Sequence, residues 1–430
     1  MSWNLLCKCL LLAAVSVISA FQFNAKAASP EFDWSGSWRL RFESLNRPIF
    51  PVAPGTRNQH NQRLSSVLFV KGQVTMDNWN FTLEMQDARA WLDNDDPTLT
   101  SSQINTFEPV NLFVRYSPQD SVLKSVTVGR VALDHGSRRL LAKAVYRNAI
   151  NSFQGIMADW QSDDVQIRTF YLQPLSRLPT DRALIDNNER AFDKGFSERR
   201  IFGVYANTVD NMWRVHSYWL KEDDAPGLAT RNRNIFTMGF EYTDTIMEDW
   251  LANIEMIGQQ GRARQTTSAS DTEDLDQRGW LIHGSLGQQI LGHTVLRAEI
   301  DLVSGDNDAS DDTIRNFDHL YGVRRFDYGP TDVYQALPRR NFVAVGARSV
   351  SKFTPKHNLM LSYKSFWYQK RPDGIDNFIG NQVEARLRWQ ATKAVRLELG
   401  GAVLFKGEGF ERGAYPDDSL YGYTALKYTF

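Results

Sequence analysis

The sequence predicts an all-β fold, a transmembrane antiparallel β-barrel of about 18 strands with short turns at one end and long loops at the other. Three observations carry this prediction. The chain closes on an alternating segment that ends in an aromatic residue, earlier segments of about ten residues alternate in the same way, and short and long connections follow each other in turn along the chain.

The closing segment is residues 421–430, with the sequence YGYTALKYTF. Gly422, Thr424, Leu426, Tyr428 and Phe430 fall on one face of a strand, and the intervening residues fall on the other. A terminal strand that ends on an aromatic residue is typical of the closing strand of a bacterial outer-membrane barrel.

Earlier segments place apolar side chains at every second position, as a strand with one lipid-facing side requires. The clearest series are Trp38, Leu40, Phe42; Phe81, Leu83, Met85; Val110, Leu112, Val114, Tyr116; Phe236, Met238, Phe240, Tyr242; Trp250, Ala252, Ile254, Met256; Leu296, Ala298, Ile300, Leu302; Leu359, Leu361, Tyr363; Val383, Ala385, Leu387, Trp389; and Val395, Leu397, Leu399.

Connections of two kinds separate these strands. Short turns are predicted at 77–78, 117–121, 162–164, 208–211, 245–248, 290–292, 352–356 and 391–393. Long polar loops are predicted at 45–61, 92–106, 132–152, 173–198, 222–233, 260–277, 305–339, 369–379 and 406–419. A soluble β-sandwich is the alternative fold, but it explains neither this regular asymmetry nor the terminal aromatic residue.

The first 27 residues have the pattern of a secretory signal peptide. Residues 5–21 are apolar, Lys8 lies near their start, and Ala25-Lys26-Ala27 is a small-residue cleavage pattern. We expect cleavage after Ala27 and a single barrel domain over residues 28–430; an uncleaved anchor is the alternative. Both cysteines, Cys7 and Cys9, fall inside the leader, so the mature chain has no disulfide.

The charge balance argues against nucleic-acid binding. The chain has 49 basic and 50 acidic residues, and losing Lys8 and Lys26 leaves 47 against 50, a net charge of −3. Nucleic-acid binding calls for a concentrated basic face.

The residues opposite the apolar series should face the lumen, and many of them are charged. They are Arg39, Arg41, Glu43, Arg63, Lys71, Glu84, Arg115, Arg168, Arg214, Glu255, Arg297, Glu299, Asp301, Lys364, Glu384, Arg386, Arg388, Arg396, Glu398 and Lys427. Basic side chains around a pore lower the barrier for anions. Alternatively, opposite charges on neighbouring strands neutralise each other, as expected for Lys71 directly across from Glu84.

The connection after Gly129 and Arg130 concentrates further basic residues, among them Arg139 and Arg147. Folded inward, this loop would form a charged constriction; in solvent, it would be an ordinary polar surface. The candidate substrate-binding set is Arg39, Arg41, Arg63, Arg115, Arg130, Arg139, Arg147, Arg168, Arg297, Glu299, Asp301, Arg386, Arg388 and Arg396. No catalytic residue, metal ligand or cofactor is expected.

The chain resembles the alginate-export family of outer-membrane barrels. The resemblance rests on Gly129-Arg130, on Arg139-Leu140, on Arg147 with Phe153-x-Gly155, and on residues 304–308, 317–321 and 328–332. It implies an 18-stranded barrel in the bacterial outer membrane that passes anionic polysaccharide or related small anions. The implied partners are an anionic carbohydrate or organic-acid solute, outer-membrane lipid and the barrel-assembly machinery.

Three other functions remain open from the sequence. An outer-membrane hydrolase is suggested by Asp134-His135, Asp318-His319 and His283-Gly284-Ser285, although no nucleophile, base and orienting acid assemble from them. Calcium binding is suggested by the oxygen ligands of Asp306, Asp308, Asp311 and Asp312. A structural barrel plugged by its loops is the third.

Overall fold

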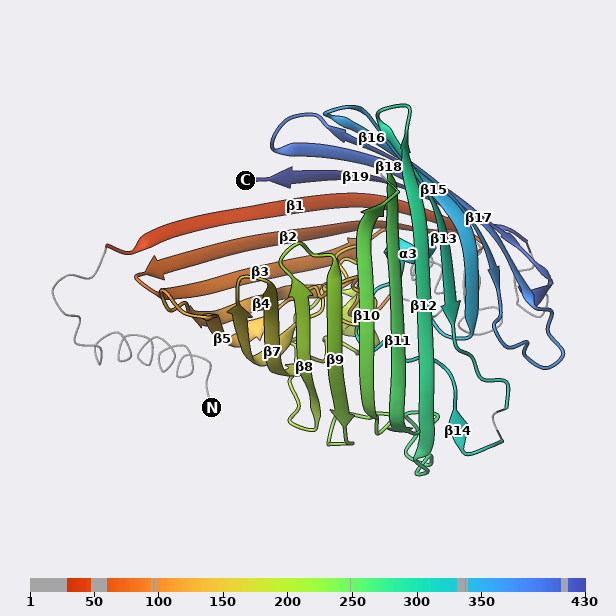
Figure 1. Cartoon of the computed structure of the whole chain (residues 1–430), viewed down its shortest axis with the longest axis horizontal. Coiled ribbons are helices and arrows are strands. Elements are labelled where there is room, and N and C mark those ends of the chain that lie inside the picture. Colours follow the sequence, from red (N-terminus) through yellow and green to blue (C-terminus); the bar gives the residue numbers. More distant parts are fainter. Residues whose placement is uncertain are drawn as a thin grey trace.

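The computed structural model describes residues 29–47, 60–93, 96, 99–247, 249–308, 310–330, 337, 339–410 and 417–430. The predicted signal peptide, residues 1–27, lies outside them. The regular secondary structure of the described residues is almost entirely strand, and long connections join the strands (Figure 1). The strands are β1 (Glu31–Asn46), β2 (His60–Met76), β3 (Trp79–Trp91), β4 (Asn105–Tyr116), β5 (Leu123–Val131), β6 (Phe153–Gln161), β7 (Val165–Pro174), β8 (Arg199–Thr208), β9 (Trp213–Glu222), β10 (Asn234–Ile246), β11 (Trp250–Ala263), β12 (Leu275–Ile290), β13 (Thr294–Val303), β14 (Thr313–Ile314), β15 (Phe342–Thr354), β16 (His357–Trp367), β17 (Phe378–Gln390), β18 (Val395–Lys406) and β19 (Ser419–Thr429).

The sheet closes on itself. Each long strand pairs antiparallel with its neighbours in the chain, and β1 pairs with both β2 and β19. β14 is a two-residue strand that pairs parallel with the start of β12, and it does not interrupt the ring because β13 pairs directly with β15. The described residues therefore form a barrel of 18 antiparallel strands, which confirms the predicted fold class.

The connections occur where the sequence predicted them. β2 ends at Met76 and β3 begins at Trp79, whereas β5 ends at Val131 and β6 begins only at Phe153. The long connections carry three short helical segments, α2 (Arg182–Asp186), α3 (Arg325–Tyr328) and η1 (Glu408–Phe410). No helix in the described part is long and apolar enough to cross a membrane.

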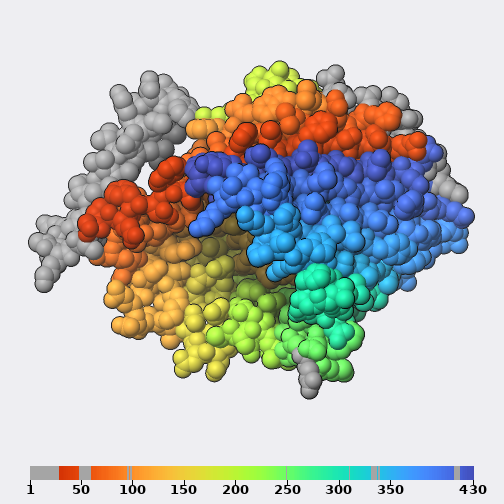
Figure 2. All heavy atoms as spheres, turned by 90° about the horizontal axis from the view of Figure 1, so that it is seen from above, coloured from red at the N-terminus to blue at the C-terminus, as the bar shows by residue number. Residues whose placement is uncertain are grey.

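The two faces of the wall differ as the alternation requires. On β10 the outward Phe236, Met238 and Phe240 are 50%, 55% and 39% exposed, while Thr237, between the first two, and Glu241, next after Phe240, are buried. An apolar outer face of this kind matches lipid, and the polar side chains fall on the inner face. Seen from above, the wall surrounds a hollow (Figure 2).

One outward prediction is wrong. Val110 was expected on the lipid face of β4 but is fully buried. The pairing of β3 with β4 moves from Glu84–Asn111 to Met85–Pro109, so Val110 is the extra residue of a bulge. A bulge shifts the alternation by one position, which a period-two pattern does not reveal.

The seam between the chain ends depends on Gly36. Its backbone exchanges two hydrogen bonds with Phe430, of 2.8 and 3.0 Å, and the Phe430 ring lies 5.7 Å from that of Trp34. A Cβ at position 36 would overlap the Phe430 ring and lie 2.7 Å from the carbonyl oxygen of Phe69.

We expect Gly36→Ala to weaken the seam by about 1–3 kcal/mol, because a side chain forced into filled space displaces its neighbours. The measurement is the temperature at which the folded barrel converts to the unfolded form on a gel in dodecyl sulfate, which should fall. Gly72→Ala is the matched control, since a Cβ there meets nothing within 4 Å. Equal transition temperatures for the two variants would contradict the prediction.

Candidate functional site

Two long connections fold into the barrel. The first is residues 132–152, here called the inner strap. From the wall, the Arg39 guanidinium donates to the carbonyl oxygens of Val145 and Arg147, at 2.9 and 3.0 Å. From the strap, the Asn148 amide nitrogen donates to carbonyl oxygens of Ser66 and Arg89, both at 2.9 Å. Buried carbonyl groups need such donors, so these bonds hold the strap against the wall. Of the two alternatives left by the sequence, the inward fold is the correct one.

The second connection contains α3. Arg325 forms an ion pair with Glu384 of β17, and the Gln382 amide donates to the Tyr328 carbonyl oxygen at 3.1 Å. The connection also joins the strap, because Tyr321 and Leu141 form a parallel bridge. The passage is therefore narrowed by two loops bound to the wall and to each other.

Between these loops and the wall lies a recess of about 140 Å³, here called the basic recess. It is lined by seven cationic side chains and one carboxylate, together with Val145, Tyr146, Phe326 and Ala425. The cations are Arg39, Arg41, Arg325, Arg386, Arg388, Arg396 and Lys427, and the carboxylate is Glu398.

Three of these cations lie in one row across three strands. Arg396 of β18 is directly opposite Lys427 of β19, and Lys427 is directly opposite Arg39 of β1. Like charges directly opposite each other destabilise a sheet. The row therefore does not stabilise the pairing of the three strands, although Arg39 also holds the inner strap. It gives the lumen a positive potential at this level.

Ion pairs neutralise part of the recess. Arg41 contacts Glu43 at 3.2 Å, Arg388 contacts Glu398, and Arg325 contacts Glu384. Within the described residues, no carboxylate pairs with Arg39, Arg386, Arg396 or Lys427. Four uncompensated cations thus surround one small volume, where an anion would be stabilised by all of them.

Tyr146 of the inner strap lines the basic recess and contacts two of its arginines. Its ring centroid lies 4.7 Å from the guanidinium carbon of Arg41 and 4.4 Å from that of Arg325. Its hydroxyl is 2.9 Å from that of Tyr421, which in turn donates to Glu43 at 2.7 Å. This chain of contacts fixes both arginines.

The predicted site residues are thus divided. Arg39, Arg41, Arg386, Arg388 and Arg396 line the basic recess. Six of the remaining residues form ion pairs outside the recess: Arg63 with Glu43, Arg130 with Glu108, Arg139 with Glu255 and Asp327, Arg168 with Asp159, Glu299 with Arg348 and Lys364, and Asp301 with His283. Arg115 donates a hydrogen bond to Thr127, and Arg297 lies directly opposite Arg348. Arg147 belongs to the inner strap. Lys71 lies across from Glu84 as predicted, and Glu84 accepts a hydrogen bond from Asn111.

The sequence did not single out the residues that the loops contribute. Arg325, Phe326 and Tyr146 line the recess from the loops, and Lys427 was assigned to the lumen without a binding role. The basic and aromatic run of residues 323–326 in the longest loop was the available signal.

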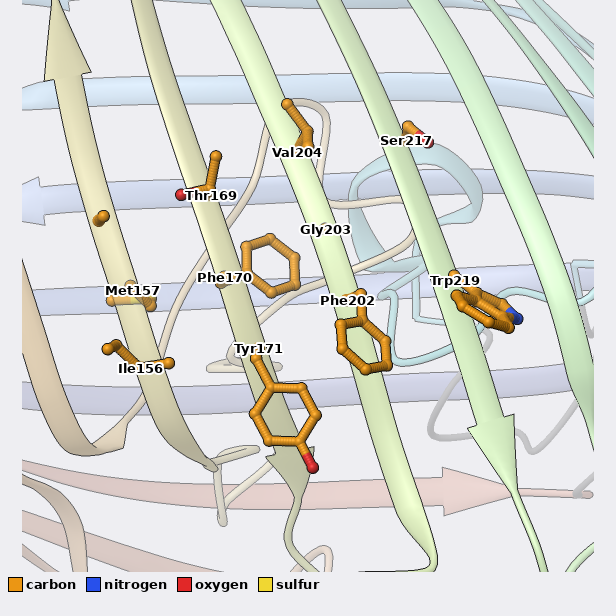
Figure 3. Close-up of a pocket in the computed structure, with 11 residues that line it drawn as sticks. Ile156, Met157, Thr169, Phe170, Tyr171, Phe202, Gly203, Val204, Ser217 and Trp219 are labelled. Carbon is orange, nitrogen blue, oxygen red and sulfur yellow. The ribbon is translucent and has the colours of Figure 1, made fainter.

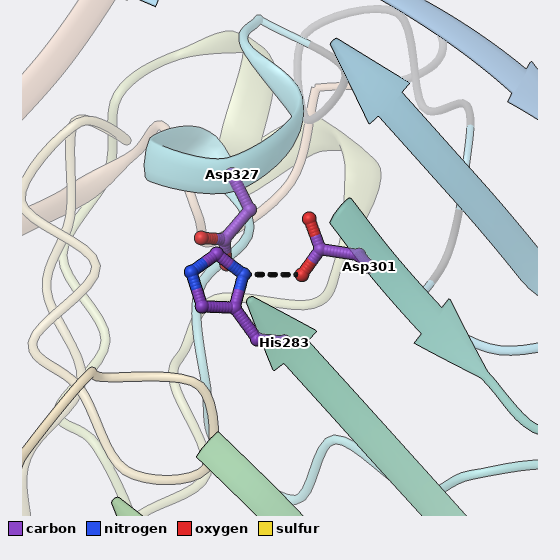
Figure 4. A group of neighbouring side chains, drawn as sticks. All are labelled: His283, Asp301 and Asp327. Carbon is purple, nitrogen blue, oxygen red and sulfur yellow. Dashed lines mark hydrogen bonds and ion pairs between the residues drawn. The ribbon is translucent and has the colours of Figure 1, made fainter. Parts of the chain in front are cut away.

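A buried ion-pair network fixes α3 on the other side. The Asp327 carboxylate forms an ion pair with Arg139 at 2.8 Å and another with Arg339. Beside it, the Asp301 carboxylate accepts a hydrogen bond of 2.9 Å from the His283 ring (Figure 4). The ligand atoms of His283, Asp301 and Asp327 lie within 4.8 Å of one another, a spacing that suits a metal ion. Because two guanidinium groups already neutralise Asp327, we interpret the network as the anchor of α3.

A second anchor lies nearer the rim. Asp318 contacts Arg233 at 2.9 Å, and Arg233 contacts Glu222 at 2.8 Å. Burial alone would raise the pKa of the Asp318 carboxyl, but Arg233 lowers that pKa to about 2. The stabilisation is therefore complete above about pH 4 and is lost as the pH falls towards 2.

The residues behind the enzyme and calcium alternatives are engaged in other contacts. His135 is buried against the rings of Phe170 and Tyr205, and in the described part no serine hydroxyl bonds to the His283 ring. In the acidic loop, the Arg315 guanidinium contacts Asp311 at 2.6 Å and Asp306 at 3.7 Å. Arg315 thus already neutralises two of the four carboxylates on which the calcium alternative rests.

Comparison with known proteins agrees with this architecture. A family model described as "Alginate export" matches residues 31–418. Among curated protein sequences, none matches the chain significantly. Solved structures share the fold: OccK11 (OpdR) of Pseudomonas aeruginosa (15% identity, 93% of this chain and 96% of that one, TM-score 0.56), OccAB1 of Acinetobacter baumannii (12%, 93% and 96%, 0.62) and Pseudomonas aeruginosa OpdK with vanillate (12%, 93% and 98%, 0.60).

Proposed function

The chain belongs to the alginate-export family and is a channel of the bacterial outer membrane, and from this premise we propose that it conducts anionic solutes past the basic recess. The proposed solutes are alginate-like polysaccharide chains or smaller anionic carbohydrates and organic acids. Movement is passive and follows the solute gradient, with no cofactor or covalent step.

The row of Arg396, Lys427 and Arg39 is the observation that carries the proposal. Such a row costs stability, and a passing carboxylate offsets that cost by its attraction to the same cations. The neighbouring Glu398 limits how tightly an anion is held, which favours passage over trapping. The other candidate residues with ion-pair partners mainly stabilise the barrel wall and hold the inward loops in place.

The solute could be a polysaccharide chain or a small organic acid. The family description supports a polysaccharide, whereas OpdK, a structural neighbour, was solved with vanillate, a small aromatic carboxylate. A recess of about 140 Å³ accommodates one sugar or one small acid at a time. We propose that successive carboxylates of a longer chain occupy it in turn.

The proposal also covers the processing of the chain and its assembly into the membrane. We propose that residues 1–27 are removed as a signal peptide and that residues 28–430 form one barrel. We also propose that the terminal Phe430 is recognised by the barrel-assembly machinery. Catalysis has no place in this account, because family membership favours a channel and the histidines have structural contacts.

The test is the reversal potential of the refolded protein in a planar bilayer under a potassium chloride gradient, with and without oligouronates. We expect an anion-selective current that oligouronates block, because their carboxylates compete with chloride for the recess. Neutral oligosaccharides of equal length are the control and should block much less. Cation selectivity, or equal block by both sugars, would contradict the proposal.

A further inference from the structure

Besides the basic recess in the lumen, the protein has a depression on the outer, lipid-facing side of the wall. Over β6, β7, β8 and β9 lies a trough of about 350 Å³, here called the outer trough. Figure 3 shows its side chains: Tyr171, Phe202 and Trp219 lie in one row across the strands, and Thr169, Val204 and Ser217 lie in the next.

The register explains the depression. Tyr171 lies opposite Phe202, and Phe202 lies opposite Trp219, with ring centroids 4.8 and 5.7 Å apart. The next outward row consists of Ala158, Thr169, Val204 and Ser217. Small side chains beside a row of large rings leave the depression open between them.

Two cations border the outer trough on its long-loop side. Arg200 of β8 lies directly opposite Lys221 of β9, each two residues beyond the aromatic row and on the same outward face. Neither has an ion-pair partner among the residues that the structure describes. The Trp219 ring beside them is held by a hydrogen bond to Asn234 of 2.7 Å.

Uncompensated cations on a lipid-facing surface need a reason. They are costly in the apolar band but favourable at the interface, where they meet anionic headgroups. Long loops mark the extracellular end of an outer-membrane barrel, so Arg200 and Lys221 lie at the outer-leaflet interface. Phosphorylated glycolipid is the anionic lipid whose headgroup charge complements this pair.

We propose that the outer trough with Arg200 and Lys221 is a binding site for lipid A, the phosphorylated multi-acyl glycolipid of the outer leaflet. A phosphate contacts the two cations, and one acyl chain lies in the trough along the small side chains. A two-fold contact between copies centred here would bring Arg200 and Lys221 against their own counterparts, so charge disfavours a second copy. The site is independent of the solute that passes through the lumen.

The test is binding of purified lipid A to the delipidated full barrel in detergent, by native mass spectrometry with titration. We expect the Arg200→Ala/Lys221→Ala variant to bind about 30-fold more weakly, because each basic residue near an anionic headgroup contributes about 1 kcal/mol. Dephosphorylated lipid A should bind the unchanged protein as weakly as lipid A binds the variant.

Two further variants make the test specific. Arg262→Ala/Arg278→Ala is the matched control, because it removes two outward cations that already share Asp276, and its affinity should be unchanged. Ser217→Leu fills the trough with the cations intact and should also weaken binding. Equal affinity of the unchanged protein and Arg200→Ala/Lys221→Ala, or loss of a dimer in place of lipid with Ser217→Leu, would overturn the proposal. Equal binding of phosphatidylglycerol and lipid A would also overturn it.

Discussion

Replacing Arg386 and Arg396 together with glutamine is expected to lower the anion-over-cation permeability ratio by an order of magnitude or more. The two side chains line the basic recess, and neither has an ion-pair partner in the described part of the chain. A unit charge about 8 Å from a passing ion, partly screened by salt, contributes about 1 kcal/mol, or about fivefold per residue. The measurement is the reversal potential under a salt gradient.

The control for this variant is Arg262→Gln/Arg278→Gln. It removes the same formal charge from exposed outward positions that are already paired with Asp276. Its reversal potential should match that of the unchanged protein. If both variants shift the potential equally, the net charge of the barrel, and not the recess, sets the selectivity.

Removing the carboxylate of Asp327 should release α3 from the inner strap and widen the passage. The Asp327→Ala variant takes a partner from both Arg139 and Arg339, which are buried. Arg139 keeps its ion pair with Glu255, but Arg339 loses its ion-pair partner. Leaving this buried charge unpaired costs about 3–5 kcal/mol, more than a four-residue helix is expected to retain. We expect a higher single-channel conductance, larger current noise and faster proteolysis of the connection that contains α3.

The Asp327→Asn variant distinguishes the effect of the lost charge from the effect of the lost side-chain volume. The amide keeps the volume and one acceptor oxygen, so its effect on conductance should be smaller than that of alanine. Both variants should keep the gel-transition temperature of the barrel, because the wall is held by its own strand ladders. An unchanged conductance in Asp327→Ala would show that α3 does not narrow the passage.

Local pattern determined much of this protein. A period of two places Phe236, Met238 and Phe240 on one face whatever the neighbouring strands are, because successive side chains of a strand point to opposite sides. Short polar segments such as 77–78 end a strand and reverse it, so strand count and connection type were also readable. Arg39, Arg386, Arg388 and Arg396 were assigned to the lumen on this basis, and they do line it.

Only the tertiary structure decided which of the charges act together. Arg39 and Lys427 meet because the first and last long strands pair, a register that no local segment specifies. Arg63, Arg130 and Arg139 looked alike in sequence but have carboxylate partners on other strands. Arg325 enters the recess through a loop that its ion pair with Glu384 holds. Charge effects depend on distances set by closure of the barrel and by loop docking, whereas alternation depends only on neighbours in the chain.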